Sequence, residues 1–162
     1  MTVCNGETMK IGILADTHGN LPQQLFSVFS GMDHLIHAGD VGSMDVLAEL
    51  TAIAPVTAVY GNCDDFSVRR HLQSTAVLEL CGFHLQIYHY VDVFREYADP
   101  AHEIIIFGHT HHSEIRKSPY GLLINPGSAS KPRGQANPTV AVLSLAVGKT
   151  PKVQLVTLNL NH

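Results

Sequence analysis

The sequence predicts an α/β fold with two β-sheets, and three observations support this prediction. In the first half, short apolar β-rich segments alternate with amphipathic helical segments, which is typical of parallel strands joined by crossover helices. The second half consists mostly of strand patterns that form antiparallel pairs. The 162 residues are 45% hydrophobic and 15% charged, which suits one compact domain with a sizeable core.

The elements of the first half follow from apolar periodicity and helix-start signals. Residues 1–8 are polar and are expected to form an N-terminal extension, so that a single domain would span residues 9–162. Ser43 is expected to cap the second helix, which turns Val46, Leu47, Leu50 and Ile53 inward. The predicted order is a strand from residue 9, a helix over 21–32, a strand over 34–38, the helix after Ser43, and a strand over 56–60.

The second half predicts a short helix followed by a series of strands. Residues 77–80 and 84–88 read as a hairpin that turns near residues 81–83. The remaining expected elements are a helix within 64–73, a helix over 91–98, a strand over 103–107, and strands within 113–125, 138–147 and 151–160.

Composition narrows the functional classes. The formal net charge of −4 disfavours binding to long nucleic acids, whereas a small anionic substrate stays compatible because a bound metal reverses the local field. The longest apolar stretch, residues 140–147, is far shorter than the roughly 20 residues that cross a bilayer. The N-terminus lacks a secretory signal pattern. Three cysteines, an odd and sparse set, predict a reducing compartment without a disulfide framework, and hence a cytoplasmic location.

Metal-binding side chains follow the predicted strands at the points where each strand ends. Ligands in open α/β sheets bind at the carboxyl ends of the strands, so these side chains are expected to meet at one rim. The Asp16-x-His18 pair alone could equally be a strand-end carboxylate that caps the next helix. The expected donors are Asp16, His18, Asp40, Asn62, His89, His109 and His111.

Two carboxylates, one amide oxygen and four imidazoles suit Mn, Fe, Zn or Ni better than Mg or Ca, which prefer oxygen ligands. Seven ligands are too many for one tetrahedral ion. They suit two ions about 3.5–4 Å apart with one carboxylate between them.

The same residues resemble the motifs of a known family. Asp16-x-His18, Gly39-Asp40, the run 61–64 (Gly-Asn-Cys-Asp), His89 and the run 108–111 (Gly-His-Thr-His) resemble the calcineurin-like metallophosphoesterase superfamily. The run 125–128 (Asn-Pro-Gly-Ser) is similar to its small bacterial and archaeal phosphodiesterase branch, which resembles a retromer scaffold subunit in fold. The resemblance extends from about residue 10 to the C-terminus. It implies a four-layer αββα sandwich of two mixed β-sheets flanked by helices.

The resemblance also implies a dinuclear site. Asp16, His18, Asp40 and His111 would hold one ion, and Asp40, Asn62, His89 and His109 would hold the other, with Asp40 bridging. The implied cofactors are two divalent transition-metal ions, Mn first, with Ni, Fe, Zn or Co as alternatives. The implied reaction is hydrolysis of a small phosphate ester, a phosphodiester first, by in-line attack of a hydroxide shared by the two ions. Asp40, Asn62 and Asp64 are the expected catalytic residues, with Asp64 either capping a helix or orienting a site residue.

Two positions depart from the family pattern. Cys63 stands where much of the superfamily carries a histidine that is thought to assist the leaving group. We therefore hypothesise a preference for good leaving groups. Tyr90 and Val91 follow His89 where the branch usually reads Gly-His, which predicts a reshaped mouth of the site. Cys63 itself is either a reactive thiol or, as we expect, a packing residue.

Other interpretations stay open beside the phosphodiesterase. One is a scaffold of the same fold that catalyses weakly or not at all, and others are a monoester phosphatase or a nuclease. A homo-oligomer is also open, because small relatives of this kind are often oligomeric. Lys131 and Arg133 either meet a substrate phosphate or are solvated loop charges, and Arg69 and Arg70 are expected on an exposed helix face. His37 is expected to be a hydrogen-bonded buried histidine.

Overall fold

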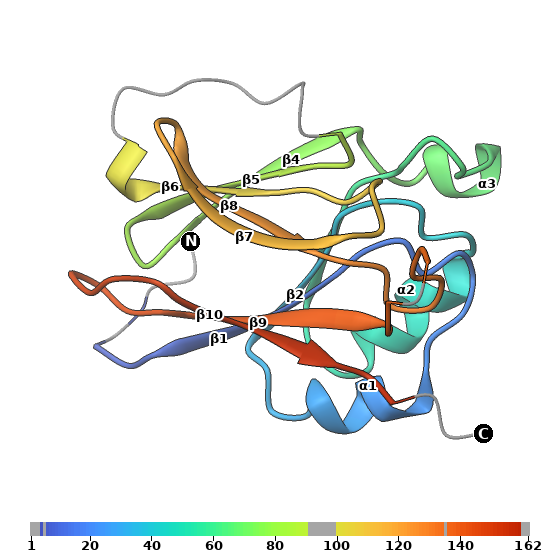
Figure 1. Cartoon of the computed structure of the whole chain (residues 1–162), viewed down its shortest axis with the longest axis horizontal. Coiled ribbons are helices and arrows are strands. Elements are labelled where there is room, and N and C mark those ends of the chain that lie inside the picture. The colour runs from blue at the N-terminus through green and yellow to red at the C-terminus, as the bar shows by residue number, and fades with distance from the viewer. Residues whose placement is uncertain (1–3, 5, 91–99, 135, 160–162) are drawn as a thin grey trace.

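The computed structural model describes residues 4, 6–90, 100–134 and 136–159. Two five-stranded sheets pack face to face (Figure 1). The first sheet has the order β10 (Lys152–Thr157), β9 (Thr139–Leu145), β1 (Met9–Leu14), β2 (His34–His37) and β3 (Val56–Ala58). The second sheet has the order β4 (Thr75–Leu80), β5 (Phe83–Tyr88), β6 (Glu103–Ile106), β8 (Gly121–Pro126) and β7 (Ser113–Ser118).

Both sheets are mixed, as predicted. In the first sheet β1, β2 and β3 are parallel, and Ile13 lies opposite Ile36, whereas β9 runs antiparallel to both β1 and β10. In the second sheet β5, β6 and β8 are parallel, while β4 and β7 pair antiparallel at its two edges. The parallel strands are central in the second sheet, whereas in the first sheet they occupy one side and end at the edge strand β3.

Alternation of side chains along the strands divides the core between the layers. The central cluster fills the space between the sheets with residues from both, including Ile11, Ile13 and Ile36 from the first sheet and Leu85, Ile87, Ile104 and Ile106 from the second. A second cluster lies between the first sheet and its helices. Leu14 and Leu35, which alternate away from the central cluster, pack there against Leu25 and Phe29. A third cluster on the outer face of the second sheet contains Tyr88, Ile105, Phe107 and Leu123.

The helices are α1 (Gln23–Val28), α2 (Met44–Thr51), α3 (Phe66–Arg69) and the 3-10 turn η2 (Pro100–His102). Ser43 caps α2 as predicted, since its side chain accepts from the Asp45 backbone N–H, and the predicted inward residues Val46, Leu47 and Leu50 are buried. α1 is shorter than the predicted 21–32 segment. The helix expected over 91–98 lies outside the described residues. None of the described helices is both long enough and apolar enough to cross a membrane.

The expectation that the cysteines form no disulfide was wrong. Cys4 and Cys81 form a disulfide, although 77 residues separate them in sequence. Cys4 lies against the turn between β4 and β5. The two Cα atoms are therefore 5.2 Å apart, a distance that a disulfide can span. The number of cysteines in the sequence does not reveal that Cys4 and Cys81 lie close together in the fold. Cys63 is free and exposed, so it is not the packing residue that the sequence suggested.

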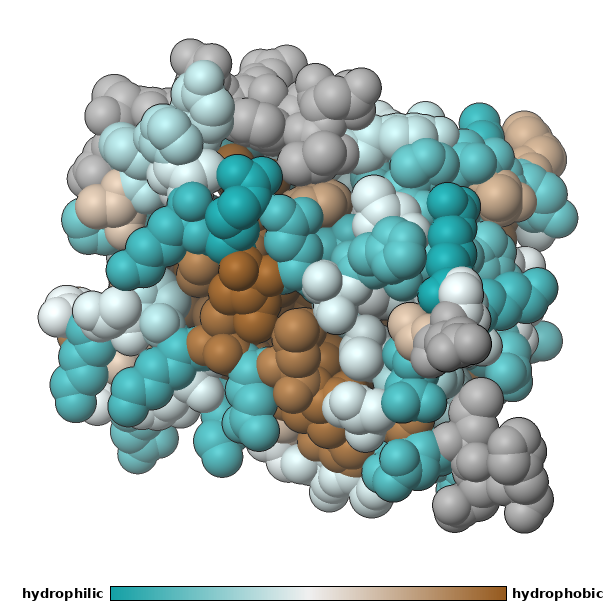
Figure 2. All heavy atoms as spheres, in the orientation of Figure 1, coloured by the Kyte–Doolittle hydropathy of each residue, from teal (hydrophilic) through white to brown (hydrophobic). Residues whose placement is uncertain are grey.

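One face of the molecule is apolar between the sheets. Figure 2 shows apolar side chains reaching the surface between β7 and β10. A groove of about 830 Å³ lies there, lined by the apolar residues Ile104, Ile115, Leu122 and Val153 and flanked by Lys117 and Lys152. It lies where β6 and β8 begin, at the opposite end of these strands from the loops described next.

Candidate metal centre

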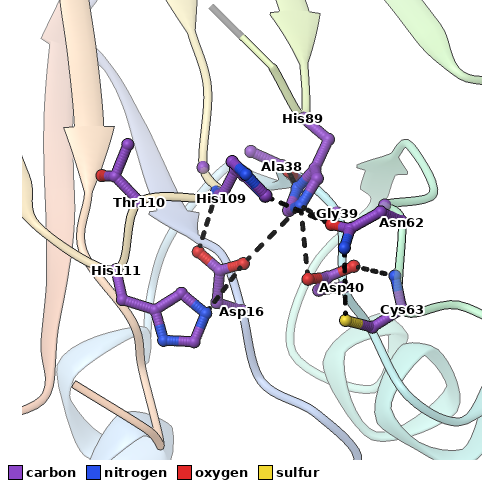
Figure 3. A network of polar contacts seen from close by, with 12 residues as sticks. Asp16, Ala38, Gly39, Asp40, Asn62, Cys63, His89, His109, Thr110 and His111 are labelled. Atoms are coloured by element: carbon purple, nitrogen blue, oxygen red, sulfur yellow. Dashed lines mark hydrogen bonds and ion pairs between the residues drawn. The ribbon is translucent and has the colours of Figure 1, made fainter. Parts of the chain in front are cut away.

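The seven predicted donors come together where the parallel strands of the two sheets end. Asp16 and His18 follow β1, and Asp40 and Asn62 follow β2 and β3. His89 directly follows β5 in the second sheet. The loop after β6 supplies His109 and His111. Figure 3 shows Asp16, Asp40, Asn62, His89, His109 and His111 pointing toward one another.

The first set of donors surrounds one point. Asp16, His18, Asp40 and His111 each offer an atom within 4.8 Å of the others. The two Nε2 atoms of His18 and His111 are 3.3 Å apart, and His111 Nε2 is 3.6 Å from Asp16 Oδ1. Ligands about 2.1 Å from one ion lie about 3 to 3.5 Å from one another, so this set fits a single cation.

The second set lies beside the first and shares Asp40 with it. His89 Nε2 is 3.0 Å from Asn62 Oδ1 and 3.3 Å from Asp40 Oδ2. His109 Nδ1 is 3.2 Å from the same Asn62 oxygen. Asp40 Oδ2 is also 3.8 Å from His18 Nε2 in the first set. Asp40 therefore stands between the two groups of donors.

Backbone carbonyls orient two of the imidazoles. His89 Nδ1 lies 2.8 Å from the Ala38 carbonyl, and His111 Nδ1 contacts the Lys131 carbonyl. A carbonyl only accepts, so each Nδ1 carries the N–H and each Nε2 of a neutral ring presents a lone pair. Both lone pairs face other acceptor atoms of the centre. A cation is the group that satisfies such an arrangement, and this tautomer control is common among metal-binding histidines.

Burial and close contacts shift the pKa values of the ionisable groups in the centre. Burial raises the pKa of Asp16 to about 7, with nearby Asp40 adding to the rise and His89 opposing it. Asp16 Oδ1 is buried and has no hydrogen-bond partner among the described residues. Burial alone would raise the pKa of Asp40, but hydrogen bonds from His89 and the Cys63 N–H bring it down to about 2. Burial opposes protonation of His89, yet hydrogen bonds to Asp40 and Ala38 raise its pKa. Without a cation, a proton on His89 Nε2 takes the position beside Asp40 that a metal ion would fill. The residues present thus fit a bound cation.

The backbone adopts left-handed conformations at most of the donors. Positive φ is uncommon for residues other than glycine and concentrates at functional sites. Here five donors have it: Asp16 (52°), His18 (48°), Asp40 (55°), His109 (72°) and His111 (60°). These conformations let a strand end turn two successive donors into one small space.

Glycines before the donors allow the loops to approach closely. A Cβ at Gly39, whose φ is 97°, would lie 2.5 Å from His89 Nδ1. A Cβ at Gly61 would lie 2.2 Å from Asp40 Oδ1. Steric crowding therefore explains why glycine precedes Asp40 and Asn62 in the sequence.

A buried hydrogen-bond chain joins the first two loops. The Gly39 N–H donates to His37 Nδ1, so His37 Nε2 carries the proton and donates to Thr17 Oγ1 at 2.9 Å. The Thr17 hydroxyl donates in turn to the Val41 carbonyl. Burial lowers the pKa of His37 to about 3, which keeps this ring neutral. His37 is hence the buried, hydrogen-bonded histidine that the sequence suggested.

Several supporting residues escaped the sequence analysis. Ser128 Oγ donates to the Asp16 carbonyl and Ser130 Oγ to the Thr17 carbonyl, which ties the loop after β8 to the loop after β1. Asn125 Nδ2 donates to the Gly108 carbonyl and to Thr110 Oγ1. Only the Asn-Pro-Gly-Ser run of the sequence pointed toward this loop.

Asp64 supports the loops and does not face the donors. Its carboxylate accepts from the backbone N–H groups of Val41, Gly42 and Gly61, at 3.1, 2.7 and 2.8 Å. The helix is capped by Asp65, whose side chain accepts from Ser67 and Val68. Of the two roles that the sequence left open for Asp64, the structure has the orienting one.

Two of the family departures, Cys63 and Tyr90, lie beside the donors, and the third, Val91, lies outside the described residues. The Tyr90 ring packs 4.5 Å from the His109 ring and 5.2 Å from the His89 ring, measured between centroids. Burial and the nearby Asp40 raise the pKa of the Cys63 thiol, so it is not a reactive thiolate. The charge of Lys131 acts on His18, and that of Arg133 acts on Asp16 and His109, so both cations belong to the surroundings of the centre.

Comparison with known proteins agrees with this geometry. The family model described as the calcineurin-like phosphoesterase superfamily domain matches residues 9–148. A protein of Methanothermobacter thermautotrophicus named a probable metallophosphoesterase is 33% identical over 149 residues, which cover 85% of this chain and 86% of that protein. A phosphodiesterase of Methanocaldococcus jannaschii is 28% identical over 138 residues, covering 74% of this chain and 83% of that protein.

The fold is also found in solved structures. Vps29 from Entamoeba histolytica, solved with Zn²⁺, superposes with a TM-score of 0.65 at 20% identity and covers 93% of this chain and 100% of its own. At this identity the likeness concerns the fold alone. The family match over residues 9–148, together with the 33% identical relative, shows that the chain belongs to the calcineurin-like phosphoesterase superfamily.

Proposed function

We propose that this protein is a metal-dependent phosphodiesterase that hydrolyses a small phosphate ester. The observation that carries the proposal is the convergence of Asp16, His18, Asp40 and His111 beside Asp16 Oδ1, a buried carboxylate oxygen without a hydrogen bond among the described residues. Asn62, His89 and His109 form the adjoining group of donors. The family relation supports a phosphoesterase, and the name of the Methanocaldococcus jannaschii relative supports a diester as substrate.

The proposed cofactor is a pair of divalent transition-metal ions, with Mn first. Asp16, His18, Asp40 and His111 would hold one ion, and Asp40, Asn62, His89 and His109 the other. When bound, such a pair acidifies a water that attacks phosphorus in line, and it neutralises charge on the phosphoryl oxygens. Transition-metal ions suit this mixture of imidazoles and oxygen ligands better than Mg or Ca.

The residues of the chain contribute position and field. Asp40 reaches both groups of donors, which supports a bridging role. The Ala38 and Lys131 carbonyls keep the Nε2 atoms of His89 and His111 directed inward. Lys131 and Arg133 add positive charge beside the centre, which favours an anionic substrate. This preorganisation is the main contribution that a protein makes to phosphoryl transfer at a metal pair.

The test is hydrolysis by metal-stripped protein resupplied with Mn, Ni, Co or Zn. The substrates are bis-p-nitrophenyl phosphate for diesters, p-nitrophenyl phosphate for monoesters, and 2′,3′-cyclic nucleotides. Faster turnover of diesters with added Mn is the expected result. A preference for the monoester would turn the assignment into a phosphatase.

The alternative is a protein-interaction module of the same fold with weak catalysis. The apolar groove between β7 and β10 favours it, since Ile115 is 38% exposed there, and exposed apolar patches often mark binding surfaces. The complete set of donors counts against it. Absence of hydrolysis in every metal, in protein shown to contain metal, would favour this alternative.

A further inference from the structure

The loop that carries Asn62 is held on its outer side by an arginine. Arg69 Nε donates to the Asp64 carbonyl at 2.6 Å, and Arg69 Nη2 donates to the carbonyls of Asn62 at 3.1 Å and Gly61 at 3.3 Å. Its guanidinium carbon lies 5.0 Å from the centre of the Tyr60 ring. Arg69 lies on an exposed helix face, as the sequence suggested, and its guanidinium also binds three carbonyls of residues 61–64.

The same loop is held on its inner side by the Asp64 carboxylate. That carboxylate accepts from the Gly61 N–H of the loop itself and from Val41 and Gly42 of the neighbouring loop. The backbone of residues 61–64 therefore lies between an anion that binds the Gly61 N–H and a cation that binds three of its carbonyls. Such charge-assisted hydrogen bonds are stronger than neutral ones.

We propose that Arg69 is a positioning residue for the metal ion expected at Asn62, His89 and His109. Asn62 is exposed, and in this loop geometry its Oδ1 lies 3.0 Å from His89 Nε2 and 3.2 Å from His109 Nδ1. Release of the three carbonyls lets the turn relax and moves Oδ1 away from the two imidazoles. This inference rests on the proposed function, because the ion is part of that proposal.

A simple cation at the end of a helix would not explain these contacts. Helix-dipole interaction requires charge near the last turn and no particular hydrogen bonds. Arg69 instead uses the planar fork of its guanidinium, whose geometry lysine lacks. Arg70, the next residue, makes no side-chain hydrogen bond or ion pair within the described part of the chain. It carries the same charge and is therefore a matched control.

The experiment titrates the metal-stripped full chain with Mn²⁺ by calorimetry and with Co²⁺ by visible absorption. The wild type is expected to bind in two steps, and His109→Ala identifies the step that belongs to the second ion. Arg69→Gln should weaken that step about 10-fold or more, the range for lost hydrogen-bond support of a metal ligand, while the other step changes less than about twofold. The affinity of Arg69→Lys for the second ion should lie between those of the wild type and Arg69→Gln. Arg70→Gln should bind both ions as the wild type does. Excess Mn²⁺ should restore turnover to Arg69→Gln.

Hydrogen exchange gives a readout that needs no metal. In metal-free Arg69→Gln the amides of Gly61, Cys63 and Asp64 should exchange faster, with protection of the β1 amides unchanged. Wild-type affinity for both ions in Arg69→Gln would overturn the inference, as would an equal weakening of both steps accompanied by a lower melting temperature. A wild-type chain without a second ion or any hydrolysis would overturn the proposed function instead, and hydrogen exchange would still decide whether Arg69 holds the loop.

Discussion

The Nε2 atoms of His18 and His111 face each other at 3.3 Å, although the two residues follow strands of different sheets. The Lys131 carbonyl holds the other nitrogen of His111, so its Nε2 presents a lone pair. Asp16 Oδ1, which has no hydrogen-bond partner among the described residues, lies 3.6 Å from the same nitrogen. Two acceptors this close, His111 Nε2 and Asp16 Oδ1, repel one another unless a cation lies between them. The metal-free centre therefore lowers the stability of the folded protein, and metal binding removes this penalty.

Metal should stabilise the protein, and the loss of His111 should remove much of that effect. A ligand at about 100 times its dissociation constant stabilises a fold by about 2.7 kcal/mol, which raises the melting temperature of a domain this size by several degrees. The measurement is thermal unfolding of the EDTA-treated protein with and without Mn²⁺. His111→Ala should respond less than the wild type, whereas the exposed neighbour His112 provides the control through His112→Ala. Equal responses of the two variants would contradict the expectation.

Asp40→Asn, Asn62→Ala and His109→Ala should each lower kcat/KM for bis-p-nitrophenyl phosphate by about 100-fold or more, since each removes a donor to the proposed metal pair. Circular dichroism should show an intact fold, because these side chains lie at strand ends and outside the apolar core. Metal content is measured on the same samples. A variant that has lost its metal and keeps full turnover would refute the assignment.

Gly39→Ala should disturb the centre through its new methyl group. The Cβ would lie 2.5 Å from His89 Nδ1, and a φ of 97° adds backbone strain. Overpacking of this kind costs roughly 1–3 kcal/mol beyond the strain. Gly19→Ala is the control, because its φ is 84° and its Cβ meets no atom within 4 Å. Urea unfolding should show a larger loss for Gly39→Ala, together with weaker Mn²⁺ binding. Equal losses would mean that backbone strain alone matters.

His37 should make the metal-free protein less stable in acid. Its pKa is about 3 in the fold because of burial and about 6.5 in an unfolded chain. The unfolded state therefore binds the extra proton between these values, and stability falls as the pH drops below about 6.5, by about 1 kcal/mol per pH unit. Asp16 acts in the opposite sense because its pKa is raised. Comparison of His37→Gln with the wild type in urea unfolding at pH 7.5 and pH 5.5 isolates the histidine. The variant should lose less stability between the two pH values, and an equal loss would rule out this role for His37.

Cys63 should restrict the protein to esters with good leaving groups. Much of the superfamily carries histidine at this position, and a thiol with a raised pKa is a weaker general acid than an imidazolium. Turnover of p-nitrophenyl diesters should exceed that of alkyl diesters, and Cys63→His should reduce the ratio of these two rates. Equal rates for both substrate types in the wild type would argue against the hypothesis.

Some of this architecture was predictable because it depends on local signals. The apolar run of β1, the Ser43 cap and the β4–β5 hairpin follow from side-chain periodicity and short-range hydrogen bonding. The seven donors were predictable for a similar reason: each stands directly after a strand, and parallel strands end at a common rim.

The contacts across the sandwich were not predictable in this way. The Cys4–Cys81 disulfide, the Ser128 bond to the Asp16 carbonyl and the Arg69 clamp join segments or atoms whose proximity no residue pattern encodes. The sequence by itself determined the elements, the two sheets and the identity of the donor side chains, because these depend on polarity and spacing along the chain. Only the tertiary structure decided the distances, burial and tautomers of those donors, because these depend on how the loops of the two sheets pack against each other.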